Sequence, residues 1–297
     1  MRRSASVLLS LSLLVGLAAC GDSDTKSDGA DGSAPASGEC GAVGRVYTKP
    51  DVTPPKADPT ELVTTDLTTG SCSAAAAVGD TVVVHYVGVR VADGAEFDNS
   101  YDRGEPFEVQ LGAGDVIQGW DQGLVGVQQG GRRQLDIPAD LAYGDSPNPG
   151  GVIQPGDALT FVVDVVAVLP GSKAEDDPGI VLEGAANVDE LAVKELLQGA
   201  GATPQEGQMV AVRIVTYRAD TGEMLASSWG GPPFPYLFAT TSDVYPGLLE
   251  AVDGMKVGGR RQAQIPFALM FDGAGNESLG LPASVDLTVV LDLVAIY

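Results

Sequence analysis

The stretch that decides the fold runs from Val84 to Phe107 and reads VHYVGVRVADGAEFDNSYDRGEPF. Three shorter stretches continue it, VIQGWDQGLVGV at 116–127, IPADLAYG at 137–144 and LTFVVDV at 159–165. Aromatic residues are only 6% of the chain, yet these stretches hold Tyr86, Phe97, Phe107, Trp120, Tyr143 and Phe161. Aromatic side chains gathered in this way line either a core or an apolar pocket. The function depends on which of the two applies.

Short runs rich in Val, Ile and Thr, broken at regular intervals by Gly, Asp and Pro, are typical of an antiparallel sheet. We predict strands over Thr81–Val87, Phe107–Leu111, Arg132–Ile137 and Leu159–Val168. The segment Val116–Val127 carries Ile117, Trp120, Leu124 and Val127 at helical spacing, which predicts one short helix. A mostly antiparallel sheet with a helix packed on it belongs to the α+β class.

The chain contains an internal repeat with an offset of 128 residues. The run GGRRQ at 130–134, followed by IP at 137–138, recurs as GGRRQ at 258–262 and IP at 265–266. The segment Pro170–Pro178, rich in charged and small residues, is interpreted as the linker. We therefore predict a first domain at 59–170 and a second domain of the same fold at 171–297.

Eight segments of the first domain resemble, in order and at similar spacing, the FKBP family of peptidyl-prolyl cis-trans isomerases. They are VHYVG at 84–88, DG at 93–94, FDNS at 97–100, PF at 106–107, VIQGWDQGL at 116–124, GGRRQLDIP at 130–138, AYG at 142–144 and the last strand at 159–168. The resemblance implies two FKBP-like domains, each an antiparallel β-sheet wrapped around a short α-helix. It also implies isomerisation of X–Pro bonds, with proline-containing segments as substrates and macrolides as possible inhibitors.

The resemblance assigns a role to each member of the aromatic group. Trp120 would form the floor of a pocket for the proline ring, with Tyr86, Phe107, Val116, Ile117 and Phe161 as its walls. Asp98 and Tyr143 would form a polar rim, and Phe97 would lie against the twisted amide. The Tyr143 hydroxyl and the Ile117 backbone N–H would bind the chain, and Asp98 would orient Tyr86 or meet a carbonyl. Without the resemblance, Trp120 could be an ordinary core residue and Asp98 a turn residue.

Such a pocket needs no acid, base or nucleophile. The planar peptide bond resists rotation with a barrier of about 18–20 kcal/mol. The twisted transition state has a less polar carbonyl, so an apolar site favours it over the ground state. The only histidine, His85, has no Cys or second His as a partner and is expected to point away from the pocket. We predict neither a metal nor a cofactor.

The second copy changes every position that makes the pocket aromatic or polar. In it, Tyr86 is replaced by Ile214, Phe97 by Leu225, Asp98 by Ala226, Trp120 by Leu248, Tyr143 by Phe271 and Phe161 by Val289. The glycines of the framework and the Ile-Pro pair remain. The second domain is therefore predicted to keep the fold and to have lost the isomerase pocket.

The first 19 residues have the pattern of an export signal. Arg2 and Arg3 precede an apolar run at Ser4–Val15 that is too short to span a bilayer. The following Leu-Ala-Ala-Cys resembles the lipobox of bacterial lipoproteins, which implies a lipid on Cys20. The alternative is an ordinary secretory signal cleaved nearby. Residues 20–58, rich in Gly, Ser, Pro and acidic residues, are predicted to be a tether to the outer face of the bacterial cytoplasmic membrane.

With Cys20 lipidated, Cys40 and Cys72 form an even pair in an exported chain. We predict a disulfide between them, two free thiols being the alternative. Closing a loop of this length stabilises a fold by about 3–4 kcal/mol in the chain-entropy model.

The chain is strongly acidic, with a net charge of −23. Removing Arg2 and Arg3 with the signal leaves 15 basic against 40 acidic residues, a net charge of −25. Such a surface repels nucleic acid and anionic lipid headgroups, so membrane contact is expected through the lipid anchor alone. The sequence does not indicate an oligomeric state.

Two functions compete. The first is an isomerase that speeds the folding of exported proteins, and the second is a chaperone or scaffold that holds clients without turnover. The plain loop Asp145–Val152 favours the second, since active members often carry an aromatic residue or His there, and Gln154 replaces a frequent Pro. A solute-binding lipoprotein would share the anchor but not the domain pattern.

Overall fold

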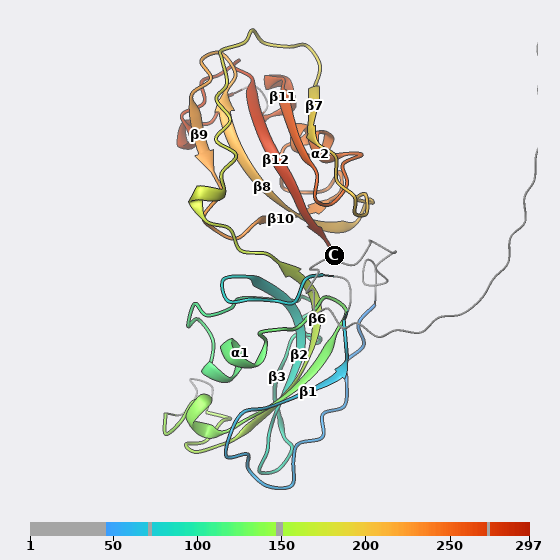
Figure 1. Cartoon of the computed structure of the whole chain (residues 1–297), viewed down its shortest axis with the longest axis vertical. Helices are drawn as coiled ribbons and strands as arrows, with labels where there is room; N and C mark the ends of the chain where they lie inside the picture. Colours follow the sequence, from blue (N-terminus) through green and yellow to red (C-terminus); the bar gives the residue numbers. More distant parts are fainter. Residues whose placement is uncertain (1–45, 71–72, 147–150, 272–273) are drawn as a thin grey trace, which may run out of the picture. The chain divides into compact units, whose positions relative to one another are not determined.

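The computed structural model describes residues 46–70, 73–146, 151–271 and 274–297. It contains two six-stranded antiparallel sheets, each with one short helix packed against it (Figure 1). Short 3₁₀ turns lie at Ala139–Leu141, Ala174–Asp176, Phe267–Leu269 and Glu277–Leu279. This architecture confirms the predicted α+β class with two domains of one fold.

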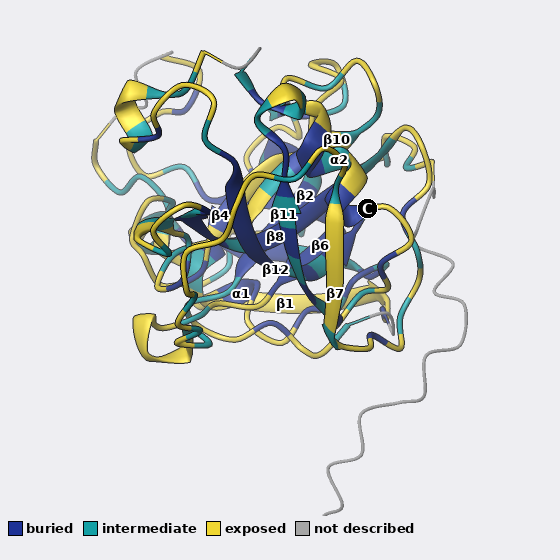
Figure 2. Ribbon diagram, turned by 90° about the horizontal axis from the view of Figure 1, so that it is seen from above, coloured by how far each residue is buried: buried dark blue, intermediate teal, exposed yellow. Residues whose placement is uncertain are grey.

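The first sheet follows the order β1-β5-β6-β2-β3, and β4 also pairs with β2. Its strands are β1 (Val63–Thr68), β2 (Thr81–Arg90), β3 (Glu96–Asn99), β4 (Phe107–Gln110), β5 (Arg132–Ile137) and β6 (Leu159–Leu169), with helix α1 at Gln118–Gly123. All the residues of β6 are buried, and all those of β1 are exposed. The central pair β2 and β6 therefore carries the core, and β1 forms an open edge (Figure 2).

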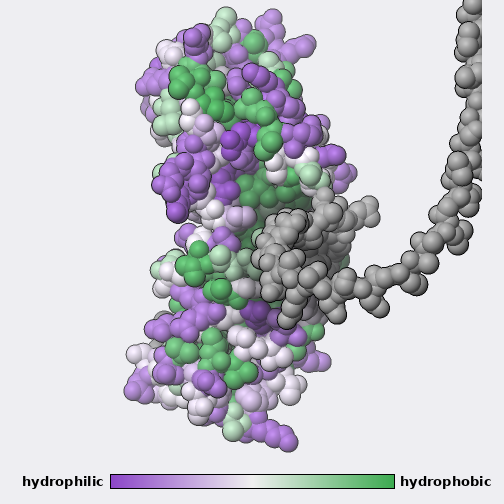
Figure 3. All heavy atoms as spheres, viewed as in Figure 1, coloured by the Kyte–Doolittle hydropathy of each residue, from purple (hydrophilic) through white to green (hydrophobic). Residues whose placement is uncertain are grey.

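The second sheet repeats this arrangement with the order β10-β8-β12-β11-β7, and β9 pairs with β8. Its strands are β7 (Ala192–Leu197), β8 (Gln208–Arg218), β9 (Met224–Ser227), β10 (Phe234–Phe238), β11 (Arg260–Ile265) and β12 (Leu287–Ile296), with helix α2 at Pro246–Val252. On the face drawn in Figure 3, hydrophilic and hydrophobic residues are interspersed over both domains.

The predicted strands are present, and β5 has the predicted bounds. The predicted helix 116–127 is too long, because α1 covers only Gln118–Gly123. Ile117 is extended, with ψ at 146°, and Gly126 has a positive φ of 85°, so neither flank continues the helix. The spacing of apolar residues was therefore helical over a longer segment than the backbone is.

Glycines bring each helix close to its sheet. A Cβ atom on Gly119 would lie 2.4 Å from a methyl carbon of Ile137, and one on Gly247 would lie 2.1 Å from the same atom of Ile265. Any larger residue would force the helix away from β5 or β11. The close contact between glycine and isoleucine explains why both residues are kept in both copies.

The paired arginines of the repeat make the same contacts in each domain. Arg132 forms an ion pair with Asp164 at 2.8 Å, and Arg260 forms one with Asp292 at 2.6 Å. The next arginine, Arg133, donates to the carbonyls that end α1. Arg261 does the same behind α2. In each GGRRQ motif the first arginine therefore joins two strands of the sheet, and the second fastens the helix to the sheet.

Candidate functional site

A cavity of about 520 Å³ opens in the first domain. It is lined by Tyr86, Phe97, Asp98, Phe107, Asp115, Val116, Ile117, Trp120, Tyr143 and Phe161. The structure thus brings together all nine residues that the sequence analysis assigned to the pocket, and it adds Asp115. A second hollow beside β1 has a volume of about 20 Å³, room for about one water molecule, so of these two only the larger could take a peptide segment.

The floor of the cavity is an aromatic box around Trp120, whose side chain is 3% exposed. Its ring meets Tyr86 at a centroid distance of 5.1 Å and an interplanar angle of 88°. It meets Phe161 at 5.2 Å and 86°. These edge-to-face contacts hold the indole in place and leave an apolar surface. The residues come from β2, α1 and β6, so the packing of the helix on the sheet assembles the box.

The missing side chain of Gly88 allows two walls of the cavity to meet. A Cβ atom at this position would lie 2.7 Å from ring carbons of both Phe97 and Phe161. These two rings are in edge-to-face contact at a centroid distance of 5.5 Å. The VHYVG motif therefore needs its glycine to bring β3 and β6 side chains together over β2.

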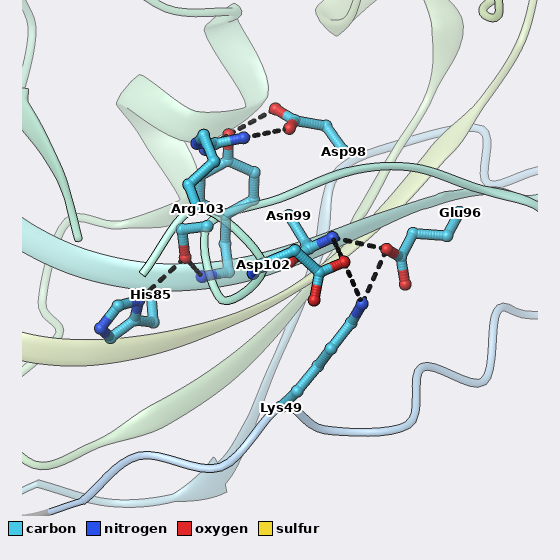
Figure 4. A network of polar contacts seen from close by, with 9 residues as sticks. Lys49, His85, Glu96, Asp98, Asn99, Asp102 and Arg103 are labelled. Carbon is cyan, nitrogen blue, oxygen red and sulfur yellow. Dashed lines mark hydrogen bonds and ion pairs between the residues drawn. The ribbon is translucent and has the colours of Figure 1, made fainter. Parts of the chain in front are cut away.

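The polar rim is a triad in which Arg103 joins the predicted residues (Figure 4). The Tyr86 hydroxyl donates a hydrogen bond to an Asp98 oxygen. A guanidinium nitrogen of Arg103 donates to the Tyr86 hydroxyl oxygen at 2.8 Å, and another forms an ion pair with Asp98. This network fixes the Tyr86 ring against the floor. The hydrogen bond from Tyr86 to Asp98 is the contact that an orienting role for Asp98 needs.

Both tyrosines of the cavity remain protonated at neutral pH. Burial, reinforced by the hydrogen bond to Asp98, raises the pKa of Tyr86 to about 12. Burial, together with the negative charge of Asp98, also raises the pKa of Tyr143. Their hydroxyl groups can therefore serve as hydrogen-bond donors throughout the physiological range.

Sequence analysis missed Arg103 and Asp115. Arg103 lies in the turn after β3, where no periodicity links it to Tyr86. Asp115 lies in the glycine-rich loop before α1, directly ahead of the VIQGW motif, and the motif gave no reason to single it out. A charged residue at the edge of a recognised motif was the only signal available for either.

His85 does not line the cavity, in agreement with the prediction that it points away. Its Nδ1 atom lies 3.0 Å from the Ser100 hydroxyl oxygen (Figure 4). Its ring stacks on Tyr101 at a centroid distance of 4.8 Å. Burial lowers the pKa of His85, so the ring is neutral at pH 7. Within the described ranges, no group of three or more His, Cys, Asp or Glu residues could hold a metal ion.

The matching positions of the second domain form apolar core instead of a polar-rimmed box. Leu248 and Val289 are buried in its hydrophobic cluster, and Ile214, Leu225 and Phe271 pack against that cluster. Tyr245 occupies the position of Ile117 and contacts the ring of Phe271 at 5.3 Å. With Ile and Ala in place of Tyr86 and Asp98, the triad of the first domain has no equivalent.

Several predicted features lie outside the described residues. These are Cys20, Cys40, Cys72, the signal peptide, the tether up to residue 45, and residues 147–150 within the segment Asp145–Val152. In the part of the chain that the structure describes, no helix has the length and hydrophobicity to cross a membrane.

Comparison with known proteins identifies the family. The model of the FKBP-type peptidyl-prolyl cis-trans isomerases matches residues 72–166 and 201–293, one segment in each domain and together more than half of the chain. An FK506-binding protein of Streptomyces anulatus is 54% identical over 121 residues, which cover 40% of this chain and 97% of that protein. The peptidyl-prolyl cis-trans isomerase FPR2 of Saccharomyces cerevisiae is 48% identical over 97 residues, or 33% of this chain and 71% of that protein.

A solved structure is also similar. The crystal structure of AtFKBP13 is 36% identical with a TM-score of 0.34, and the match covers 38% of this chain and 96% of that one. The family match, the two sheets with their helices and the aromatic cavity agree with one another. The chain belongs to the FKBP-type peptidyl-prolyl cis-trans isomerase family.

Proposed function

We propose that the first domain isomerises X–Pro bonds in exported proteins, while a lipid on Cys20 holds the chain at the outer face of the bacterial cytoplasmic membrane. The observation that carries the catalytic part is the cavity over Trp120, which combines an aromatic floor with a rim of hydrogen-bonding groups. Family membership makes X–Pro bonds the substrate class.

The cavity would act by differential binding. Uncatalysed X–Pro isomerisation takes tens to hundreds of seconds because the amide must lose its conjugation when it twists. The proline ring would sit on the Trp120 indole, and Phe97 and Phe161 would surround the amide with apolar surface. The twisted amide has a weaker dipole than the planar one, so this dry surface lowers the barrier without a proton transfer.

The rim would hold the peptide while the bond rotates. The Tyr143 hydroxyl and the backbone N–H of Ile117 are donors beside the cavity, suited to carbonyl oxygens of the bound chain. Arg103 and Asp98 would keep Tyr86 from turning into the space needed by proline. When the peptide is held on both sides of the X–Pro bond, that bond is the torsion that can rotate most easily.

Replacing Trp120 by Leu, its counterpart in the second domain, tests this proposal. We expect kcat/KM for a Leu-Pro peptide to fall by at least about tenfold, because a tenfold loss corresponds to only about 1.4 kcal/mol of transition-state binding. The control is Leu248→Met, a volume-conserving change at the matching position, which should leave the activity unchanged. Circular dichroism verifies that both variants are folded. Full activity in a folded Trp120→Leu variant would refute the pocket assignment.

The second domain is proposed to be a degenerate copy that supports or holds clients. In favour of this role, it lacks the tyrosine, aspartate and tryptophan of the cavity, and it exposes the apolar side chains of Met224 and Phe234. A purely client-holding chain remains the competing function, and it predicts peptide binding by the first domain without acceleration of isomerisation.

The membrane anchor has a separate test. In a bacterial host, Cys20→Ala should move the chain from the membrane fraction to the soluble extracytoplasmic fraction, since the acyl chains that bury in the bilayer would be missing. Immunoblotting of the fractions gives the distribution. Retention of Cys20→Ala in the membrane would contradict the lipid anchor, and the isomerase assay would be unaffected by that outcome.

A further inference from the structure

We propose that Asp115 makes the isomerase prefer prolines flanked by lysine or arginine. This inference rests on the isomerase function proposed for the first domain, and it names the class of client. The carboxylate lines the cavity immediately before Val116 and Ile117, and its residue is exposed to solvent. A bound peptide would therefore pass within reach of it.

Asp115 is not needed to build its own loop. The loop between β4 and α1 turns through Gly112 and Gly114, both with positive φ. Their N–H groups donate to the carboxylate of Asp121, at 3.0 and 3.1 Å. Asp121 thus performs the structural task that an aspartate in such a turn usually performs. Among the described residues, no side chain forms an ion pair or hydrogen bond with the Asp115 carboxylate.

The other carboxylate of the cavity is already neutralised. Asp98 is held by the Arg103 guanidinium and by the Tyr86 hydroxyl. The lining therefore has two carboxylates and one paired cation nearby, which leaves one negative charge without a partner. That charge belongs to Asp115.

The rest of the domain strengthens this bias. Residues 59–170 contain four arginines, no lysine and 16 acidic residues, a net charge of −12. Each arginine forms an ion pair with a carboxylate, namely Arg90 with Asp93, Arg103 with Asp98, Arg132 with Asp164 and Arg133 with Asp66. No cation of the domain is left to attract an acidic client. A cavity with low-dielectric walls concentrates such a field at its mouth.

The charge preference can be measured on peptides with one Leu-Pro bond. In each peptide one position is varied, either the residue two places before the proline or the residue directly after it. That position is occupied by Lys, Gln or Glu. At low ionic strength we expect kcat/KM to be about two- to fivefold higher for Lys than for Gln at one or both positions, the range of an exposed ion pair, and lower for Glu. The difference should shrink as salt is added.

Two variants separate the local charge from the total charge. Asp115→Asn should bring the Lys-to-Gln ratio to about one, because the partner of the cation is gone. Glu61→Gln removes the same charge from an exposed residue that does not line the cavity, and it should keep both the ratio and the basal activity. The Gln peptide serves as an internal reference for each enzyme.

The possible results separate a failure of the proposed role of Asp115 from a failure of the isomerase function on which it rests. Turnover of the Gln peptide with equal rates for Lys, Gln and Glu overturns the role of Asp115 and leaves the isomerase intact. A Lys preference that Asp115→Asn retains also overturns it, and assigns the preference to the overall field. Absence of turnover for all three peptides by the folded chain refutes the isomerase itself.

Discussion

Tyr86 couples the apolar floor of the cavity to its polar rim. Its ring packs edge-on against Trp120, and its hydroxyl joins Asp98 to Arg103. Burial and the Asp98 hydrogen bond raise its pKa to about 12. The protonated phenol is thus favoured in the folded state. Its contribution to stability is present below the ordinary tyrosine pKa of about 10 and is lost as the pH rises from there towards 12.

Replacing Tyr86 by Phe should therefore leave the phenolate absorbance of the folded chain unchanged up to about pH 10, where an ordinary tyrosine is half ionised. The phenolate absorbance of the Tyr86→Phe variant should fall below that of the parent chain only as the pH approaches 12. An ultraviolet titration of both proteins measures this difference. If the variant lost the signal of one tyrosine already near pH 10, the triad would not hold the hydroxyl as described.

Family-like motifs predicted the aromatic residues of the cavity, because the identities and the spacing of these residues are shared between members of the family. Arg103 and Asp115 were not predictable in that way. Their importance depends on which carboxylates already have a partner, and this is decided by the contacts of Asp98 and Asp121 in three dimensions. A sequence gives the number of charges but not their pairing.

The elements repeat with their hydrogen bonds as well as their order. The Ser100 hydroxyl, fully buried after β3, accepts from the backbone N–H of Tyr86 at 2.9 Å. Ser228, 128 residues later, accepts from the N–H of Ile214 at the same distance. Each serine thus ties the end of a short strand to the middle of the long strand of its domain.

Replacing either serine by Ala should strand one backbone N–H, at a cost of about 1–3 kcal/mol. Ser100→Ala should increase hydrogen exchange along β2, and Ser228→Ala should increase it along β8. Because β2 carries Tyr86 of the cavity and β8 carries none of the residues that line it, only Ser100→Ala should also change the isomerase activity. Peptide-resolved hydrogen exchange provides the readout. If one variant increased hydrogen exchange equally along β2 and β8, the two serine contacts would not act independently.

Runs of β-branched residues predicted the strands well because β2 and β6 are buried along their length, where Val and Ile pack best. The end of α1 was missed for a physical reason. Leu124 and Val127 stay buried after the helix has ended, so their spacing continues the helical pattern while the backbone at Gly126 does not. Edge strand β1 is exposed throughout and gave little hydrophobic signal.

At the scale of the whole molecule, the chain pairs one domain that has a complete aromatic cavity with one whose matching positions are apolar core. The offset of 128 residues predicted the shared fold, because the framework positions are kept in both copies. That the changed cavity positions cost the second domain its isomerase activity stays a prediction. We therefore expect catalysis in the first domain alone.

The most direct test compares residues 46–170 and 171–297 as separate proteins in one proline-isomerisation assay. Circular dichroism and cooperative thermal unfolding first establish that each is folded. We predict acceleration by 46–170, its loss in the Trp120→Leu form of that segment, and no acceleration by 171–297. Activity in the folded second segment, or none in a folded first segment, would contradict the assignment of catalysis to the first domain alone.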